Sequence, residues 1–117
     1  MIYTSYYGNW RKWTGKGFVL CQVSNSKPKW FTESVIKIDP FIPSWSLVSG
    51  YKNGTVTEDQ FKETYLKQLN NISEFGFYLP KDRNHLFLCH ETPDQFCHRH
   101  ILRGWINSKG VQCEEYV

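Results

Sequence analysis

Residues 85–105 read HLFLCHETPDQFCHRHILRGW, and this stretch decides the fold of the chain. It opens with a block of consecutive apolar residues, which is typical of a strand covered on both faces of a parallel sheet. Thr92 follows, with Gln95 three positions later, and this pair forms the pattern of a capping box at a helix start. The stretch therefore predicts a strand over 85–90 that leads directly into a helix from Thr92 to about Asn107.

The remaining sequence alternates between strand and helix patterns. A second capping box, Thr57 with Gln60, opens a helix whose apolar residues recur at helical spacing. This alternation favours an α/β fold with a mostly parallel sheet and helices on both faces, in a single domain over residues 1–117. The other predicted strands cover residues 2–7, 18–23, 35–38 and 111–117. The other helical segments cover 43–51 and 72–77, and residues 10–16 form either a loop or a short helical turn.

The charge balance of the chain is mildly basic. It has 14 Lys and Arg against 11 Asp and Glu, a formal net charge of +3. The sequence has no clustered basic stripe of the kind that duplex-binding proteins carry, so we do not expect duplex nucleic acid as a partner. A weak positive balance suits a small molecule that bears phosphate.

Four cysteines, at positions 21, 89, 97 and 113, bear on the cellular compartment. The N-terminal residues lack the charged start and the long apolar run of a signal peptide. No apolar stretch reaches membrane-spanning length. We therefore expect a cytoplasmic protein with reduced thiols and no membrane partner.

The residues that carry chemistry gather where the predicted central strand meets the predicted helix. Ligands of parallel α/β sheets bind beyond the carboxyl ends of the strands, so we expect the pocket between the ends of the first strands and residues 91–99. Helical spacing places Arg99 and Arg103 on one row that faces the rim of the expected pocket. The free N–H groups at the start of the helix favour an anion there. The candidate ligand-binding residues are Glu91, His98 and Arg99, followed by Ser5, Tyr6 and Lys27.

A thiol enzyme and a zinc site are the chemical alternatives to simple binding. As a catalytic nucleophile, either Cys89 or Cys97 would serve. Cys97 would lie past the first turn of the predicted helix, where the helix dipole helps a thiolate little. Cys89, Cys97, His98 and His100 are zinc-ligand types. However, adjacent residues on a helix point about 100° apart, so Cys97 and His98 should not converge, and we assign no metal or other cofactor.

Binding without chemistry would use the polar groups of the same segment. Glu91 can accept hydrogen bonds from a ribose or a base edge, and Arg99 or Arg103 can hold a phosphate by bidentate contact. Aromatic side chains outside the segment can stack on a base. The candidates for stacking are Tyr6, Tyr7, Trp10 and Trp30.

The same segment resembles a known family. Residues 88–91, Leu-Cys-His-Glu at a strand end, and residues 96–99, Phe-Cys-His-Arg opening a helix, are similar to the short members of the domain of unknown function 488 (DUF488) family. Residues 3–6 resemble the first strand of that family, and residues 23–30 resemble its second strand and the loop that follows. One departure is His90, where the family usually has an aromatic residue.

The resemblance implies a small Rossmann-like three-layer fold and a bacterial or bacteriophage setting. Our leading hypothesis is a small-molecule binding domain for a nucleotide-like ligand, such as an anti-defence protein that sequesters a nucleotide signal of host immunity. One alternative is a thiol-dependent enzyme that acts on a nucleoside or nucleotide. Another is a protein inhibitor that covers a host enzyme through exposed aromatic residues. Catalysis and homo-oligomer formation are both left open at this point.

Overall fold

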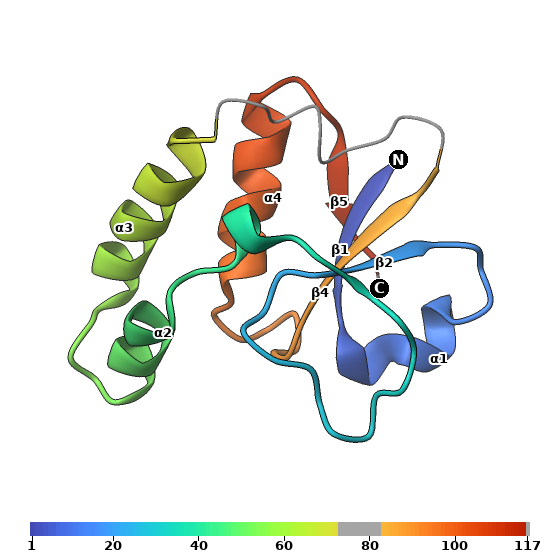
Figure 1. Cartoon of the computed structure of the whole chain (residues 1–117). Helices are drawn as coiled ribbons and strands as arrows, with labels where there is room; N and C mark the ends of the chain where they lie inside the picture. Colours follow the sequence, from blue (N-terminus) through green and yellow to red (C-terminus); the bar gives the residue numbers. More distant parts are fainter. Residues whose placement is uncertain (73–82, 117) are drawn as a thin grey trace.

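A five-stranded parallel sheet in the order β3-β2-β4-β1-β5 forms the centre of the molecule. The computed structural model describes residues 1–72 and 83–116 (Figure 1). The α/β, Rossmann-like fold and the mostly parallel sheet predicted from the sequence are confirmed, and every strand pair is parallel. The strands are β1 (Ile2–Tyr6), β2 (Val19–Gln22), β3 (Ile36–Lys37), β4 (His85–Cys89) and β5 (Cys113–Glu115).

Helices cover both faces of the sheet, which makes three layers (Figure 1). One face packs against the longer helices α3 and α4, and the other packs against α1 and the segment that follows β2. The helices are α1 (Trp10–Trp13), α2 (Trp45–Lys52), α3 (Glu58–Asn70) and α4 (His98–Ser108), with short 3-10 turns η1 (Tyr7–Asn9) and η2 (Asp39–Phe41).

Strand β4 is buried along its whole length, as its run of apolar residues predicts. Its side chains alternate between the two faces, so Leu86 and Leu88 pack with the α1 layer while Phe87 packs with α3 and α4. Cys89, at the carboxyl end, falls on the α4 side. The end of β4 therefore aims this cysteine at the start of the helix that follows it.

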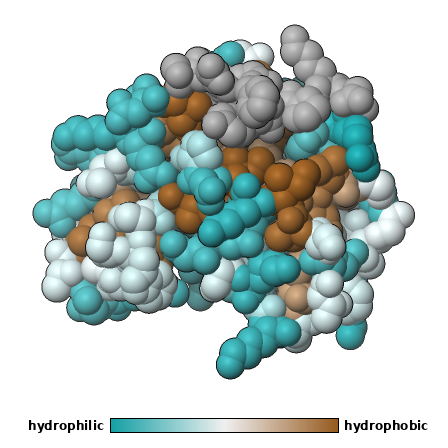
Figure 2. All heavy atoms as spheres, viewed as in Figure 1, coloured by the Kyte–Doolittle hydropathy of each residue, from teal (hydrophilic) through white to brown (hydrophobic). Residues whose placement is uncertain are grey.

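Helix α3 begins where its sequence predicts. Thr57 and Gln60 form the complete capping box, with Thr57 N donating to Gln60 Oε1 at 2.9 Å and Gln60 N donating to Thr57 Oγ1 at 3.1 Å. The residues at helical spacing, Phe61, Tyr65 and Leu69, are buried against the sheet. In Figure 2, hydrophilic residues form the outer edge at the left, over α3, and hydrophobic residues show through nearer the centre.

Helix α4 begins later than predicted, at His98, with Cys97 as its N-cap residue. The predicted start at Thr92 is wrong because the apparent capping box there closes an isolated turn. Gln95 N donates to Thr92 O at 3.1 Å, and the Thr92 hydroxyl donates to Asp94 Oδ1 at 2.5 Å. Cys97 then adopts extended backbone, with φ −147° and ψ 140°, before the helix starts.

Among residues 1–72 and 83–116, no helix combines the length and the apolar character needed to span a bilayer. The segment predicted at 72–77 lies outside the described residues from position 73 onward.

Candidate functional site

A cleft opens beyond the carboxyl ends of β2 and β4. It consists of two adjoining hollows of about 350 and 300 Å³ that share Val48, Lys52, Glu91 and His98 as common borders. The chain leaves β2 toward the α1 layer and leaves β4 toward α4, so the connections diverge on opposite faces of the sheet. Such a divergence is where open parallel sheets hold ligands.

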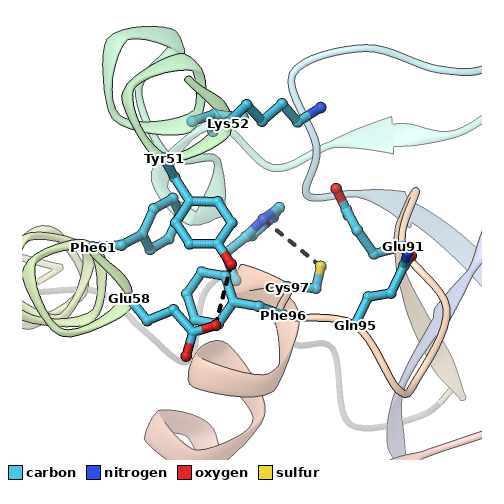
Figure 3. A pocket seen from close by; sticks show the side chains of 10 residues that line it. Tyr51, Lys52, Glu58, Phe61, Glu91, Gln95, Phe96 and Cys97 are labelled. Carbon is cyan, nitrogen blue, oxygen red and sulfur yellow. Dashed lines mark hydrogen bonds between the residues drawn. The ribbon is translucent and has the colours of Figure 1, made fainter. Parts of the chain in front are cut away.

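One wall of the cleft is aromatic (Figure 3). The rings of Tyr51 and Phe96 lie 4.6 Å apart between centroids, and Phe61 meets Phe96 edge-on at 5.3 Å. The Tyr51 hydroxyl donates to Glu58 Oε1 at 3.1 Å, which fixes the tyrosine ring. These rings offer a flat apolar surface to a ligand.

Polar side chains border the rest of the cleft. Lys52 comes from the end of α2, and Glu91 and Gln95 come from the segment after β4, on the other side of the cleft in Figure 3. Glu91 is half-buried, and its Oε2 atom lies 3.5 Å from Cys89 Sγ. The cleft therefore presents an ammonium group, carboxylates and amides to whatever enters it.

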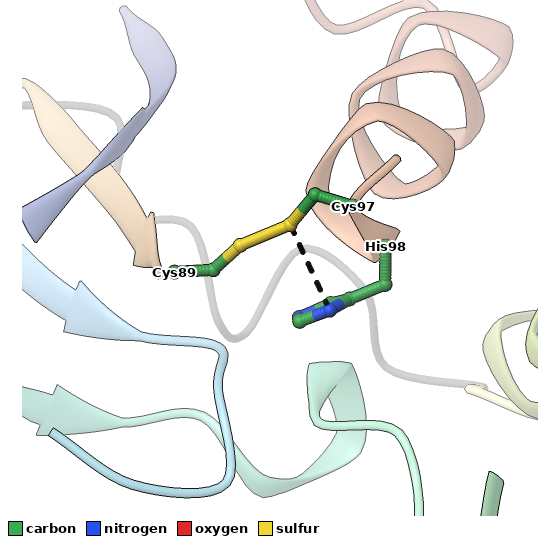
Figure 4. Close-up of side chains that lie close together, drawn as sticks. All are labelled: Cys89, Cys97 and His98. Carbon is green, nitrogen blue, oxygen red and sulfur yellow. Dashed lines mark hydrogen bonds between the residues drawn. A yellow bond between two sulfur atoms is a disulfide. The ribbon is translucent and has the colours of Figure 1, made fainter. Parts of the chain in front are cut away.

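Cys89 and Cys97 are joined by a disulfide at the inner end of the cleft (Figure 4). Of the two, Cys97 lines the cleft, while Cys89 is fully buried. The expectation of four reduced thiols is met by Cys21 and Cys113, which are free, and burial raises the pKa of both of these thiols to about 12. The expectation is wrong for the 89–97 pair because β4 and the α4 N-cap bring the two sulfurs together.

His98 faces this sulfur pair from the first position of α4. Its Nε2 atom donates to the carbonyl oxygen of Val23, so in the neutral ring the Nδ1 atom is a free acceptor, 4.0 Å from Cys97 Sγ. Burial, helped by the neighbouring Arg99, lowers the pKa of His98 to about 4, against the opposing effect of the Val23 hydrogen bond. The imidazole is therefore neutral near pH 7.

Arg99 is fully buried, so its predicted place at the rim is wrong. Arg99 and Arg103 do share one helical row, but both face Glu115 on β5, and that contact had no signal in the local pattern. Arg99 Nη2 pairs with Glu115 Oε2 at 2.8 Å, and Arg99 Nη1 donates to Glu91 O at 2.6 Å and to Cys89 Sγ at 3.3 Å. The guanidinium thus contacts the inner sulfur and the backbone of Glu91, but it does not border the cleft.

The other predicted site residues lie outside the cleft. Ser5 lies on the opposite face of β1, where its hydroxyl donates to Tyr116 O at 3.2 Å. The half-buried Tyr6 ring lies beneath the Arg99 guanidinium, 5.7 Å from centroid to Cζ. Lys27 is exposed in the segment after β2. Of the six predicted ligand-binding residues, the cleft brings together only Glu91 and His98.

Three of the four zinc-ligand candidates do converge. The ligand atoms of Cys89, Cys97 and His98 lie within 4.8 Å of one another. Cys97 and His98 converge, contrary to the prediction, because Cys97 has extended rather than helical backbone. His100 is outside the group, and its Nδ1 accepts from Arg103 Nη1 at 3.1 Å. In the reduced state these residues could supply three ligands to a soft metal ion such as Zn²⁺.

Sequence reasoning missed most of the cleft walls. Phe61 was assigned only to the buried stripe of α3, and the remaining wall residues were given no site role. The one local signal was Phe96, which stands directly before Cys97 in the motif. The missed lining residues are Ser24, Asn25, Ser26, Trp45, Val48, Tyr51, Lys52, Glu58, Phe61, Gln95 and Phe96.

Comparison with known proteins gives one match. A family model, DUF488-N3a, described as the active DUF488-N3 subclade, matches residues 23–110. No curated protein and no solved structure matches the chain. The matched range contains both cysteines of the disulfide, Glu91 and the whole of α2 and α3.

Proposed function

This chain belongs to the DUF488 family, and we propose that it is an enzyme whose substrate is a nucleotide-like small molecule. The substrate binds in the cleft and reacts with a cysteine thiol. The observation that carries this proposal is the position of Cys97, which is both the N-cap residue of α4 and part of the cleft wall. The description of the matching subclade as active supports catalysis over binding alone.

The shape and lining of the cleft support a nucleotide-like ligand. A hollow of about 350 Å³ is within the ordinary size range of small-molecule sites. The Tyr51 and Phe96 rings suit a flat base, and the Lys52 ammonium suits an anionic group such as phosphate. Glu91 and Gln95 can hydrogen-bond hydroxyl groups of a sugar.

The surroundings of the two sulfurs support a thiol nucleophile after reduction of the disulfide. The N-terminus of α4 and the Arg99 guanidinium are both positive, and positive surroundings stabilise a thiolate. The neutral His98 ring, with its acceptor Nδ1 atom toward Cys97, can take the thiol proton. Cys97 is the better placed nucleophile because it lines the cleft, whereas Cys89 is shielded.

The simplest reaction that these residues support is a hydrolytic displacement. The Cys97 sulfur, having given its proton to His98, bonds to an electrophilic atom of the ligand, and the leaving group departs with that proton. Water, oriented by the Glu91 carboxylate, then attacks the covalent intermediate. Its hydroxyl joins the second product and its proton returns through Glu91 to the freed Cys97 sulfur. Lys52 and the aromatic wall hold the ligand in both steps.

The test is an activity screen of the reduced protein against nucleosides and nucleotides, read out by mass spectrometry. We expect turnover of at least one compound, loss of turnover in Cys97→Ser, and a trapped covalent adduct on Cys97 when the chain carries Glu91→Gln. Free Cys21 is a matched control, since Cys21→Ser should keep activity. Full turnover by Cys97→Ser would overturn the proposed chemistry.

Binding without catalysis is the second candidate, and the disulfide favours it. While Cys89 and Cys97 are joined, the cleft keeps its aromatic and polar walls but has no nucleophile. A protein that sequesters a nucleotide signal needs only those walls. Calorimetry with the Cys89→Ser/Cys97→Ser variant separates the two functions: ligand binding without any turnover by the reduced wild type would favour sequestration.

A further inference from the structure

Two tryptophans lie outside the cleft, on the α1 side of the molecule. Trp10 begins α1, and Trp30 lies in the segment that follows β2. Their side chains are 37% and 55% exposed, and they border a common hollow of about 270 Å³ together with Phe31 and Glu33. Exposed tryptophans with no core to fill are typical of binding surfaces.

The two segments that carry these tryptophans are held side by side. The Thr14 hydroxyl donates to the Glu33 carboxylate at 3.4 Å, and the ring of Trp13 packs against Phe31 at 6.1 Å between centroids. Phe31 in turn contacts the Trp30 ring edge-on at 6.1 Å. Buried Trp13 and Phe31 therefore support the exposed rings of Trp10 and Trp30 from below.

The same two segments carry the positive charge of the chain. Residues 10–16 and 27–33 hold five of the 14 Lys and Arg but only one of the 11 Asp and Glu. The rest of the chain has nine basic and ten acidic residues, so the net charge of +3 comes entirely from these 14 positions. All five basic side chains belong to exposed residues: Arg11, Lys12, Lys16, Lys27 and Lys29.

We propose that this surface, formed by residues 10–16 and 27–33, binds single-stranded nucleic acid. Exposed aromatic rings combined with a positively charged surface are the two components that such binding needs, because bases stack on the rings and phosphates contact the cations. Arg11 lies over the Trp10 ring, with Cζ 5.6 Å from the centroid, so a base that stacks on this face displaces the guanidinium and leaves it free to contact the adjacent phosphate.

Single strands fit this surface better than a duplex. The bases of a duplex are stacked on one another and cannot reach Trp10 or Trp30, whereas the unpaired bases of a single strand can. The basic residues became a cluster only through folding, because 10–16 and 27–33 are separated in sequence by β2. The proposal does not depend on the thiol chemistry proposed for the cleft.

The primary test measures the fluorescence anisotropy of a labelled 12-nucleotide oligo-dT and oligo-U with the intact protein. We expect binding at low salt, with a slope of log K against log salt that reaches about −3.5 if all five cations contact phosphates. A duplex of the same length and anionic phospholipid vesicles serve as competitors. Equal affinity for the duplex, or binding to vesicles and not to oligonucleotides, would overturn the proposal.

Variants separate stacking from charge. Trp10→Ala and Trp30→Ala should each weaken binding about 5- to 100-fold, and Trp30→Phe should regain most of that loss because it restores an aromatic face. Lys27→Glu with Lys29→Glu should weaken binding and flatten the salt slope. The charge-matched control, Lys62→Glu with Lys67→Glu on α3, should bind like the wild type. Circular dichroism verifies the fold of each variant, and tryptophan variants with unchanged affinity would contradict the proposal.

Discussion

Arg99 and Glu115 form a buried ion pair that joins the first turn of α4 to the last strand. Arg99 Nη2 lies 2.8 Å from Glu115 Oε2, Arg99 Nε lies 3.2 Å from both carboxylate oxygens, and the Thr4 hydroxyl also donates to Glu115. Burial alone would raise the pKa of Glu115, but the Arg99 and Thr4 hydrogen bonds outweigh it and hold this pKa below its usual value. The pair therefore makes Arg99 a structural residue.

Replacing Arg99 should lower the free energy of unfolding, and its effect should not be limited to the loss of a ligand contact. Arg99→Ala leaves the Glu115 carboxylate buried without its main partner, which typically costs about 3–5 kcal/mol. Urea unfolding followed by circular dichroism measures the change. Arg103 is the matched control, since it approaches Glu115 only at 3.6 Å and its side chain is 29% exposed. Arg103→Ala should cost under about 1 kcal/mol, and equal losses for the two variants would contradict this account.

The disulfide predicts how many cysteines an alkylating reagent can reach in the unfolded chain. Protein purified without reductant and unfolded in guanidinium should take up two groups of iodoacetamide, at Cys21 and Cys113, and four after reduction. Intact mass spectrometry counts the groups. The Cys97→Ser variant should take up three without any reductant, because Cys89 is then free. Four groups on the unreduced wild type would rule out the Cys89–Cys97 bond.

Stability should fall between pH 6.5 and about pH 4 because of His98. Burial lowers its folded-state pKa to about 4, while the unfolded chain has the ordinary value of 6.5. In this pH range His98 is protonated in the unfolded state but neutral in the folded state, so the free energy of unfolding decreases as the pH falls. Between pH 7.5 and 5 the loss should be about 2 kcal/mol by urea unfolding.

His98→Gln should remove most of that pH dependence. His100→Gln is the control, because the His100 pKa is also lowered but its ring is only half-buried, so the His98 contribution should persist. Glu115 adds its own loss only below its unfolded pKa of 4.5, which lies outside the measured range. An unchanged slope in His98→Gln would show that another group controls the acid sensitivity.

Two threonines with the same sequence pattern should respond differently to substitution. Thr57→Ala removes the N-cap of α3 and should cost about 1 kcal/mol. Thr92→Ala removes only a contact with Asp94 in an exposed turn, so it should cost less than about 0.5 kcal/mol. Thermal unfolding of both variants measures the difference. A larger loss for Thr92→Ala would mean that the turn before α4 supports the helix.

Local patterns sufficed to predict the elements but not the start of α4. The capping box at Thr57 and the apolar run of β4 are local, and both are confirmed. The identical pattern at Thr92 does not start a helix, because Cys97, five residues later, has extended backbone and a helix cannot continue through it. That one shift moved Cys97 to the helix N-terminus and allowed it to converge with His98.

The candidate site could be placed from the sequence but not assembled from it. The ends of β4 and the motif around Cys97 locate the cleft, since both are close in sequence. The aromatic wall depends on how α2 packs against the segment before α4, which brings Tyr51 to Phe96. The burial of Arg99 on α4 depends on Glu115, which lies 16 residues later on β5. Such long-range contacts leave no local pattern.

The position of β4 between β1 and β2 constrains the order of events during synthesis. Among residues 1–72 and 83–116, β1 pairs with β4 and β5 alone, and β2 is connected to β1 through β4. A nascent chain that has emerged only as far as α3 therefore lacks both of the strands that pair with β1 in the described part of the fold, and the apolar residues of β1 are not yet covered. The ribosome must release the residues of β4 before the sheet can close, so a pause or truncation just upstream of His85 would leave a chain exposed to chaperones and proteases.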